Sequence, residues 1–342
     1  LDRSSAASDV YKRQIIPVQW GLNLLNSRPK NRIANMTEIY HREGLEIEPL
    51  HSALGARIRG LDLRQPLDCK TFAAVHRAWM DHLVLLFPDQ SISDAQQIAF
   101  SEMFGDLECH HQDIIKSIWE PEIFRVSNVD DDGNLMSPDH PTVAQVSLAQ
   151  RWHTDSSYRP SPSMGSILHG LEVTEEGGET CFTYMYAVYN ALSDRLRDKV
   201  GGRKLRHDSE YLTTLAPVRP LTDEERAATP PVWQPMRRRH PVTGRTALYV
   251  SPHTISEIVG LSAEESRPIL EEIYEFATED RFIYEHRWTQ NDVIMWDNRC
   301  TMHAVTPFDN QTQRRIMHRT TIVGEEAPIP MGSTSWHSAR SL

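Results

Sequence analysis

Cysteine is scarce in this chain, and its placement excludes two common classes of site. The 342 residues include four cysteines, which lie far apart and form no CxxC pair. The sequence therefore contains neither a zinc ribbon nor a thioredoxin-type redox motif. Few and widely spaced cysteines are typical of a reducing compartment, and we expect a cytoplasmic protein.

Positive charge and long apolar runs are also lacking. The 36 Lys and Arg residues are outnumbered by 47 Asp and Glu residues, which gives a formal net charge of −11 at pH 7. Such a field repels phosphate backbones and anionic lipid surfaces, so we expect no nucleic-acid partner and no membrane partner. No apolar run approaches the roughly 20 residues that cross a bilayer. We therefore expect a soluble protein.

The two ends of the chain differ from its middle. Residues 1–35 carry six Lys or Arg against two Asp and follow no helical or strand period, which predicts an extension that is disordered or not native. Residues 36–324 contain no clean linker, and we expect a single domain there. Residues 325–342, with several Pro and Ser, are typical of a loose C-terminal tail.

Short alternating segments dominate the middle of the chain. Alternation with a period of two predicts strands within 45–48, 56–59, 124–129, 165–173, 180–185 and 282–288. Further short strands are predicted at 82–87, which is a continuous apolar run, and at 293–296 and 315–323. Helical periods are found at 70–81, 94–104, 187–200 and 262–278, two of them opened by capping-box pairs. Residues 210–240, rich in proline and charge, predict a long loop that could act as a lid.

This pattern predicts a mainly β fold with flanking helices. Strands are many and short, helices are few, and the sequence has no Gly-rich phosphate loop. Such a pattern favours a β-sandwich or a jelly roll, with helices packed outside.

One of the histidine motifs has the spacing of a metal site. Sixteen histidines make roughly two chance His-x-Asp or His-x-Glu triplets expected, and three occur, at His41, His111 and His153. In the segment 152–158, the period of two of a strand would place His153 and Asp155 on one face. We therefore favour this triplet as two ligands of one metal ion.

His303, at the end of the segment 293–303, is the candidate third ligand. Two imidazoles and one carboxylate leave three coordination positions open, as non-haem Fe(II) needs for a bidentate cosubstrate and oxygen. Zinc is the rival metal, although the sequence has no HExxH motif. Arg315 and Arg319 follow on a shared strand face, where two guanidinium groups could bind two carboxylate-like groups.

These motifs follow one another in an order that resembles a known family. They are similar to the motifs of the taurine dioxygenase family of Fe(II)- and 2-oxoglutarate-dependent oxygenases in residues 152–158, 177–180 and 296–303 and in the pair Arg315 and Arg319. Within that family, residues 156–160 and 293–303 are more similar to 2,4-dichlorophenoxyacetate dioxygenase than to taurine enzymes. The likeness extends over about 45–323. It implies a jelly roll, that is, a double-stranded β-helix of the cupin type, and suggests a homo-oligomer.

The resemblance implies a set of residues for the metal and the cosubstrate. His153, Asp155 and His303 match the iron ligands of the family. Thr180 and Arg315 match the residues that hold the distal carboxylate of 2-oxoglutarate, the cosubstrate that is used with O2.

It also implies substrate contacts. Arg319 matches an arginine near the substrate anion, and His110 matches a substrate-contacting histidine of taurine enzymes. Ala149 replaces the asparagine that those enzymes have four residues before the first ligand, which weakens the case for a sulfonate. The implied reaction is hydroxylation, with possible cleavage, of a small organic anion. We expect an aryloxyalkanoate-like carboxylate ahead of taurine, an alkyl sulfonate or a sulfate ester.

Several alternatives remain open. The chain could be a non-oxidative metalloenzyme or an anion-binding module of the same fold. Thr180 is also an ordinary strand residue, and Asp297 and Asn298 could form a turn rather than orient the metal ligands. The run Arg237–Arg239 is typical of a solvated face.

Overall fold

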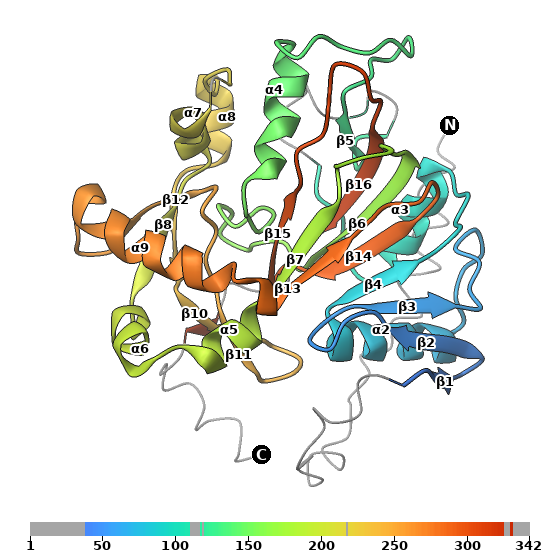
Figure 1. Cartoon of the computed structure of the whole chain (residues 1–342), viewed down its shortest axis with the longest axis horizontal. Coiled ribbons are helices and arrows are strands. Elements are labelled where there is room, and N and C mark those ends of the chain that lie inside the picture. Colours follow the sequence, from blue (N-terminus) through green and yellow to red (C-terminus); the bar gives the residue numbers. More distant parts are fainter. Residues whose placement is uncertain (1–37, 110–116, 118–119, 217, 325–328, 331–342) are drawn as a thin grey trace, which may run out of the picture. The chain divides into compact units, whose positions relative to one another are not determined.

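The structure, a computed structural model, describes residues 38–109, 117, 120–216 and 218–324 and the backbone of residues 329–330. All of them belong to the unit Thr37–Leu342. Strands dominate this unit and helices flank them (Figure 1), which confirms the predicted mainly β class. Within the described ranges, no helix is long and apolar enough to cross a membrane.

An eight-stranded sheet is the largest layer. Its strands follow the order β1-β2-β3-β4-β14-β6-β16-β5, and all neighbours are antiparallel except β3 and β4. In that order the strands are β1 (Tyr40–Arg42), β2 (Leu45–Pro49), β3 (Ala56–Arg59), β4 (Val84–Phe87), β14 (Val293–Asp297), β6 (Gly165–Glu172), β16 (Ile316–Ile322) and β5 (Phe124–Ser127).

Three smaller sheets complete the β structure of the described residues. Their orders are β13-β7-β15, β12-β8-β9 and β11-β10-β17. The strands are β13 (Ile283–His286), β7 (Thr180–Tyr184), β15 (Thr301–Val305), β12 (Ile255–Ile258), β8 (Lys204–His207), β9 (Val232–Pro235), β11 (Thr246–Leu248), β10 (Arg237–Arg239) and β17 (Ile329–Pro330).

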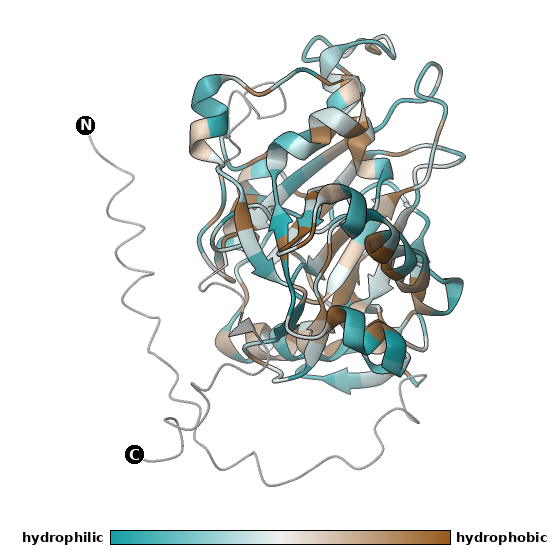
Figure 2. Cartoon of the chain, turned by 90° about the vertical axis from the view of Figure 1, so that its left-hand side faces the viewer, coloured by the Kyte–Doolittle hydropathy of each residue, from teal (hydrophilic) through white to brown (hydrophobic). Residues whose placement is uncertain are grey.

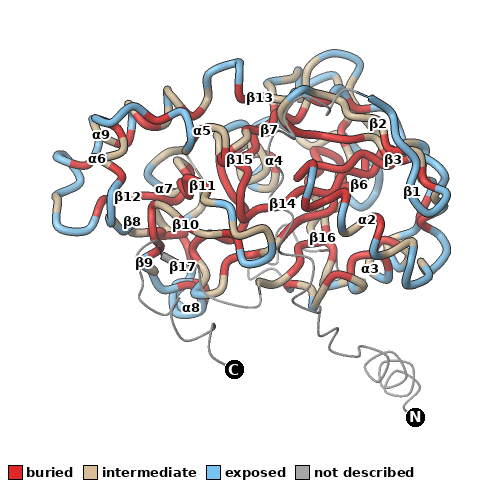
Figure 3. The backbone as a smooth tube through the Cα atoms, turned by 90° about the horizontal axis from the view of Figure 1, so that it is seen from below, coloured by how far each residue is buried: buried red, intermediate tan, exposed pale blue. Residues whose placement is uncertain are grey.

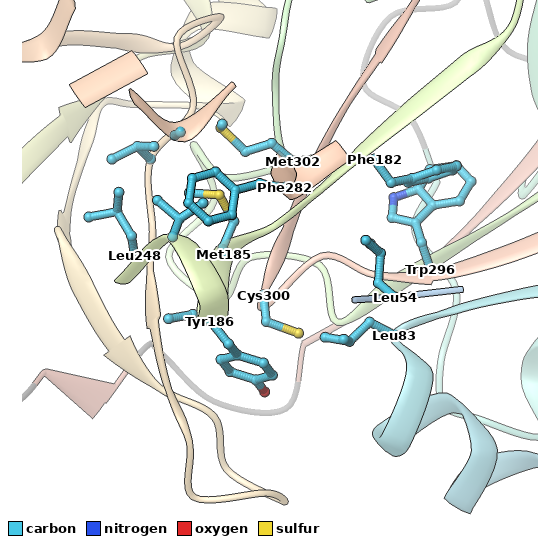
Figure 4. Close-up of a cluster of buried hydrophobic side chains, with 14 of the residues drawn as sticks. Leu54, Leu83, Phe182, Met185, Tyr186, Leu248, Phe282, Trp296, Cys300 and Met302 are labelled. Atoms are coloured by element: carbon cyan, nitrogen blue, oxygen red, sulfur yellow. The ribbon is translucent and has the colours of Figure 1, made fainter. Parts of the chain in front are cut away.

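The large sheet buries both of its faces. Along β4, Val84 and Leu86 join one hydrophobic cluster, whereas Leu85 and Phe87 join another. Successive side chains of a strand point to opposite faces, so the two clusters lie on opposite sides of the sheet. The first includes side chains of β7 and β15 (Figure 4), and the second includes side chains of two helices. Burial on both faces explains why β14 and β6 are among the buried strands in Figure 3.

The long helices lie where the sequence predicts them. They are α2 (Cys69–His82), α3 (Asp94–Glu102) and α9 (Ala263–Ala277). The capping boxes opened by Ser93 and Ser262 are both formed. The helices in Figure 2 carry both teal and brown turns, as amphipathic helices do. The short helices are α4 (Pro141–Ser147), α5 (Met185–Ala191), α6 (Asp194–Val200), α7 (Leu212–Leu215) and α8 (Asp223–Ala228).

Two predictions of local structure are wrong. The predicted helix 187–200 is two helices, α5 and α6, because the Ser193 side chain accepts a hydrogen bond from the Leu196 amide and begins a new helix. The predicted loop 210–240 holds α7, α8, β9 and β10. A capping box begins α8. β9 pairs with β8 and β10 pairs with β11, and no local sequence pattern predicts these strand pairings.

The predicted solvated face of Arg237–Arg239 is also wrong at its central residue. Alternation along β10 turns Arg238 inward, where it is 4% exposed. Its guanidinium lies over the ring of Tyr249, 4.6 Å from the centroid. Arg238 is therefore a buried cation that packs on an aromatic ring, not part of a solvated face.

A buried ion pair holds the turn between β14 and β15. Arg299 contacts both carboxylate oxygens of Asp297, at 2.8 Å for Oδ1 and 2.6 Å for Oδ2. His240 Nε2 lies 3.0 Å from Asp297 Oδ2, and the Thr301 hydroxyl donates to the Asp297 carbonyl at 2.8 Å. These contacts set the direction in which β15 begins.

We expect Asp297→Asn to lower the free energy of unfolding by roughly 3–5 kcal/mol, because it leaves the Arg299 charge buried without a counter-ion. The measurement is chemical denaturation. The control is Glu46→Gln, which breaks the exposed pair with Arg59 and should cost less than about 1 kcal/mol. Equal losses in the two variants would contradict this role of the buried pair.

Candidate metal centre and cosubstrate pocket

The structure brings His153, Asp155 and His303 together. His303 lies on β15, and its backbone pairs with that of His153 through hydrogen bonds of 2.9 and 2.8 Å. His153 Nε2 lies 3.8 Å from Asp155 Oδ1, and His303 Nε2 lies 3.8 Å from Asp155 Oδ2. The ligand atoms of the three side chains all fall within 4.8 Å of one another. Such spacing could hold one small metal ion.

The protonation states of the two imidazoles suit a metal. His153 Nδ1 lies 2.8 Å from the Arg151 carbonyl, which accepts its proton and leaves the Nε2 lone pair free. Burial lowers the pKa of His153 and holds that of His303 well below its ordinary value. Both rings are therefore neutral near pH 7 and can donate a lone pair.

Asp155 is held as a carboxylate. Burial on its own would raise the pKa of this side chain, but the charge of Arg319, the two neighbouring imidazoles and the Ser166 hydrogen bond together bring the pKa below its usual range. Arg319 Nη1 donates to Asp155 Oδ1 at 2.6 Å, and the Ser166 hydroxyl donates to Asp155 Oδ2 at 2.6 Å. The third candidate ligand is thus charged and fixed in orientation.

A polar network behind Asp155 was not predicted in full. Asn298 Nδ2 donates to the hydroxyl oxygens of Ser163 and Ser166 at 3.0 and 2.9 Å, and Trp296 Nε1 donates to Asn298 Oδ1 at 2.9 Å. Of the two interpretations of Asn298, this geometry supports the one in which it orients a candidate ligand. Ser166 has no sequence signal, since a serine in a buried strand is not unusual on its own.

Arg315 lines a cavity whose wall also includes Ala149 and Val305. It is 4% exposed, and burial lowers the pKa of its guanidinium to about 10. Within the described part of the chain, no carboxylate lies within ion-pair distance of it, and Nη2 makes a long contact of 3.4 Å to the Gly178 carbonyl. Thr180 pairs across β7 and β15 with Val305, one of the residues that line the cavity.

Arg319 contacts Asp155 and lies over the ring of Phe124, 4.3 Å from the centroid. His110, the other predicted substrate residue, lies outside the described residues. His253, which no sequence motif singles out, also lies at the site, with its ring centroid 4.7 Å from that of His153. Nor does any motif single out Glu108, a buried carboxylate that accepts from the Ser156 hydroxyl at 2.6 Å.

A second cluster of possible ligands is less suited to a metal. His240, Asp297 and Cys300 lie close together, and all are buried. Both carboxylate oxygens of Asp297 already accept from Arg299. Burial raises the pKa of the Cys300 thiol well above its ordinary value, so it stays protonated. We therefore assign the cluster to the turn that it stabilises.

Comparison with known proteins identifies the family. Residues 46–321 match the family described as taurine catabolism dioxygenase TauD, TfdA family. The chain belongs to the TauD/TfdA family. It is similar to the alpha-ketoglutarate-dependent 2,4-dichlorophenoxyacetate dioxygenase of Cupriavidus pinatubonensis, with 34% identity over 80% of this chain and 96% of that protein.

Other TauD/TfdA members show the range of similarity. The (S)-phenoxypropionate/alpha-ketoglutarate-dioxygenase of Delftia acidovorans is 35% identical over 80% of this chain and 94% of that protein. Among solved structures, AAD-2 in complex with Mn(II) and N-oxalylglycine has a TM-score of 0.75 and 35% identity, over 83% of this chain and 98% of that chain.

The donor set fits the metal chemistry of this family. Two neutral imidazoles and one carboxylate lie together in a buried position. An arrangement of this type is typical of non-haem Fe(II) sites with open coordination positions. The buried cation of Arg315 fits an anionic cosubstrate, because an unpaired buried charge is costly.

We expect Ser166→Ala to weaken divalent-metal binding by about ten- to hundredfold, because it removes the hydrogen bond that orients Asp155. Mn(II) titration in the absence of oxygen measures the affinity. The control is Ser256→Ala on β12, whose hydroxyl contacts Arg206 instead and should leave the affinity unchanged. Wild-type Mn(II) affinity in Ser166→Ala would exclude this orienting role.

Proposed function

We propose that the protein is an Fe(II)- and 2-oxoglutarate-dependent dioxygenase that hydroxylates a small organic anion. One observation carries the proposal: His153, Asp155 and His303 lie together in a buried position. A nearby cavity is lined by Arg315, which has no carboxylate partner among the described residues. His153, Asp155 and His303 would hold the iron. When bound, iron and 2-oxoglutarate supply the activation of O2 and the oxidation of a substrate C–H bond.

The chain itself supplies position, charge and exclusion of water. Arg315 would bind the distal carboxylate of 2-oxoglutarate in a pocket where bulk water does not weaken the attraction. Thr180 would donate a second hydrogen bond to the same carboxylate. His153, Asp155 and His303 are buried, which would limit the access of water to the reacting groups. The hydrogen bonds to Asp155 and His153 would fix the geometry of these ligands before the substrate binds.

For the substrate we propose an aryloxyalkanoate-like carboxylate. The support comes from relatives named for 2,4-dichlorophenoxyacetate and (S)-phenoxypropionate, at 33–35% identity. Arg319, beside Asp155, is the cation proposed for the substrate anion, with His110 as a further contact. Ala149 lines the cavity without an amide to offer a sulfonate.

A sulfate ester, an alkyl sulfonate or taurine is the second candidate class. The alpha-ketoglutarate-dependent sulfate ester dioxygenase of Pseudomonas putida is 29% identical over 85% of this chain, which supports keeping this class. Hydroxylation at a carbon that bears the ether oxygen, the sulfate-ester oxygen or the sulfonate sulfur would give an unstable product, and the bond from that carbon to oxygen or sulfur would then break to release the leaving group.

We also propose the finer features of the architecture and setting. Residues 36–324 would form one oxygenase domain with a jelly-roll, double-stranded β-helix core, in which the large sheet faces β13-β7-β15. Residues 210–240 would act as a lid, residues 1–35 as an extension and residues 325–342 as a tail. A cytoplasmic homo-oligomer is the proposed form.

We expect O2 uptake that requires Fe(II) and 2-oxoglutarate and that rises with an aryloxyalkanoate more than with taurine or an alkyl sulfate. An oxygen electrode, together with succinate release, measures both across a panel of carboxylates, sulfonates and sulfate esters. Turnover of taurine but of no carboxylate would reverse the order of the two substrate classes.

We expect Asp155→Ala to lower Fe(II)-dependent turnover by about a hundredfold or more, because it removes a direct ligand rather than a residue behind one. The control is Asp280→Ala at an exposed position, which should retain wild-type turnover. Activity with Zn(II) and without 2-oxoglutarate would instead support a non-oxidative metalloenzyme. Anion binding without turnover in the wild type would support a binding module.

A further inference from the structure

Trp288 makes a direct hydrogen bond to Thr180. It follows β13, the strand that pairs with β7, and its indole Nε1–H donates to Thr180 Oγ1 at 2.9 Å. Both side chains are buried. An indole N–H can donate but not accept, so the Thr180 oxygen must be the acceptor in this bond. The direction of the bond is therefore known from the chemistry of the two groups.

The bond leaves the Thr180 hydroxyl proton for another partner. A threonine hydroxyl has one proton to donate, and Trp288 cannot take it. Within the described ranges, this hydroxyl forms no second hydrogen bond with a side chain or a carbonyl. A carboxylate only accepts hydrogen bonds, so it is the type of group that a hydroxyl held in this way would bind.

We propose that Trp288 is a positioning residue that turns the Thr180 hydroxyl into a donor for the distal carboxylate of 2-oxoglutarate. This inference rests on the proposed function. Without the indole N–H, the hydroxyl could rotate and present its oxygen to the carboxylate, which would repel it. Trp288 acts through Thr180, whereas Arg315 supplies the charge.

The packing around the indole holds it in this orientation. The ring of His286 meets it edge-on, with centroids 4.9 Å apart and planes at 88°. His286 is fixed in turn by Asp292 Oδ2 and by the Tyr284 hydroxyl, each at 3.2 Å. A Cβ at position 170 would lie 3.1 Å from Trp288 Cε3, so the glycine at this position in β6 leaves room for the ring.

The test is Trp288→Phe, which keeps an aromatic ring and removes the N–H. Calorimetric titration of 2-oxoglutarate into the Mn(II)-loaded protein without oxygen measures binding apart from turnover. We expect an affinity about three- to tenfold lower, the range for loss of one hydrogen bond, with Mn(II) affinity unchanged. In turnover, KM for 2-oxoglutarate should rise while kcat at saturation stays near wild type. The control is Trp233→Phe at a half-exposed position on β9.

A double-mutant cycle with Thr180→Val separates positioning from packing. If Trp288 acts through Thr180, Trp288→Phe should lower the affinity for 2-oxoglutarate no further in the Thr180→Val background. Equal losses in both backgrounds, or wild-type affinity in Trp288→Phe, would overturn the inference.

A second variant, Gly170→Ala, serves if Trp288→Phe does not fold. The added methyl group would press on the indole and should weaken 2-oxoglutarate binding while leaving Mn(II) affinity unchanged. Wild-type affinity in that variant would likewise overturn the inference. Failure of the wild type to bind 2-oxoglutarate would overturn the proposed function.

Discussion

The backbone pairing of His153 with His303 is the contact on which the candidate site depends. These residues are separated by about half the chain, and two hydrogen bonds bring them side by side. On its other edge, β15 pairs with β7, which begins at Thr180. One strand therefore links the candidate metal ligands to the residues proposed for 2-oxoglutarate. Loss of this pairing would separate both groups at once.

Charge is distributed unequally in the buried site. Asp155 has Arg319 as its counter-ion, whereas Arg315 has no carboxylate partner among the described residues. Because a buried unpaired charge is unfavourable, the pocket has a physical requirement for one more anion. This requirement supports the proposed binding of an anionic cosubstrate at Arg315.

The short segment 296–299 serves two networks. Trp296 and Asn298 connect to Ser166 and so to Asp155, while Asp297 and Arg299 form the ion pair that directs β15. Trp296 and Asp297 point to opposite faces because they are neighbours in β14, and the turn that follows adds Asn298 to one network and Arg299 to the other. The segment that ends β14 thereby supports the ligand on one side and the strand carrying His303 on the other.

The sequence alone determined the features that depend on local spacing. The mainly β class and the capped helices at Ser93 and Ser262 follow from periods and caps that a few residues set. The strand expected through 152–158 is wrong, because His153 lies in an isolated bridge and Asp155 begins a turn. Tertiary structure decided the rest: that Ser166 orients Asp155, that Trp288 reaches Thr180 and that Arg238 is buried. These contacts join residues that are up to 108 positions apart or depend on which face a strand buries, and no local pattern encodes such pairings.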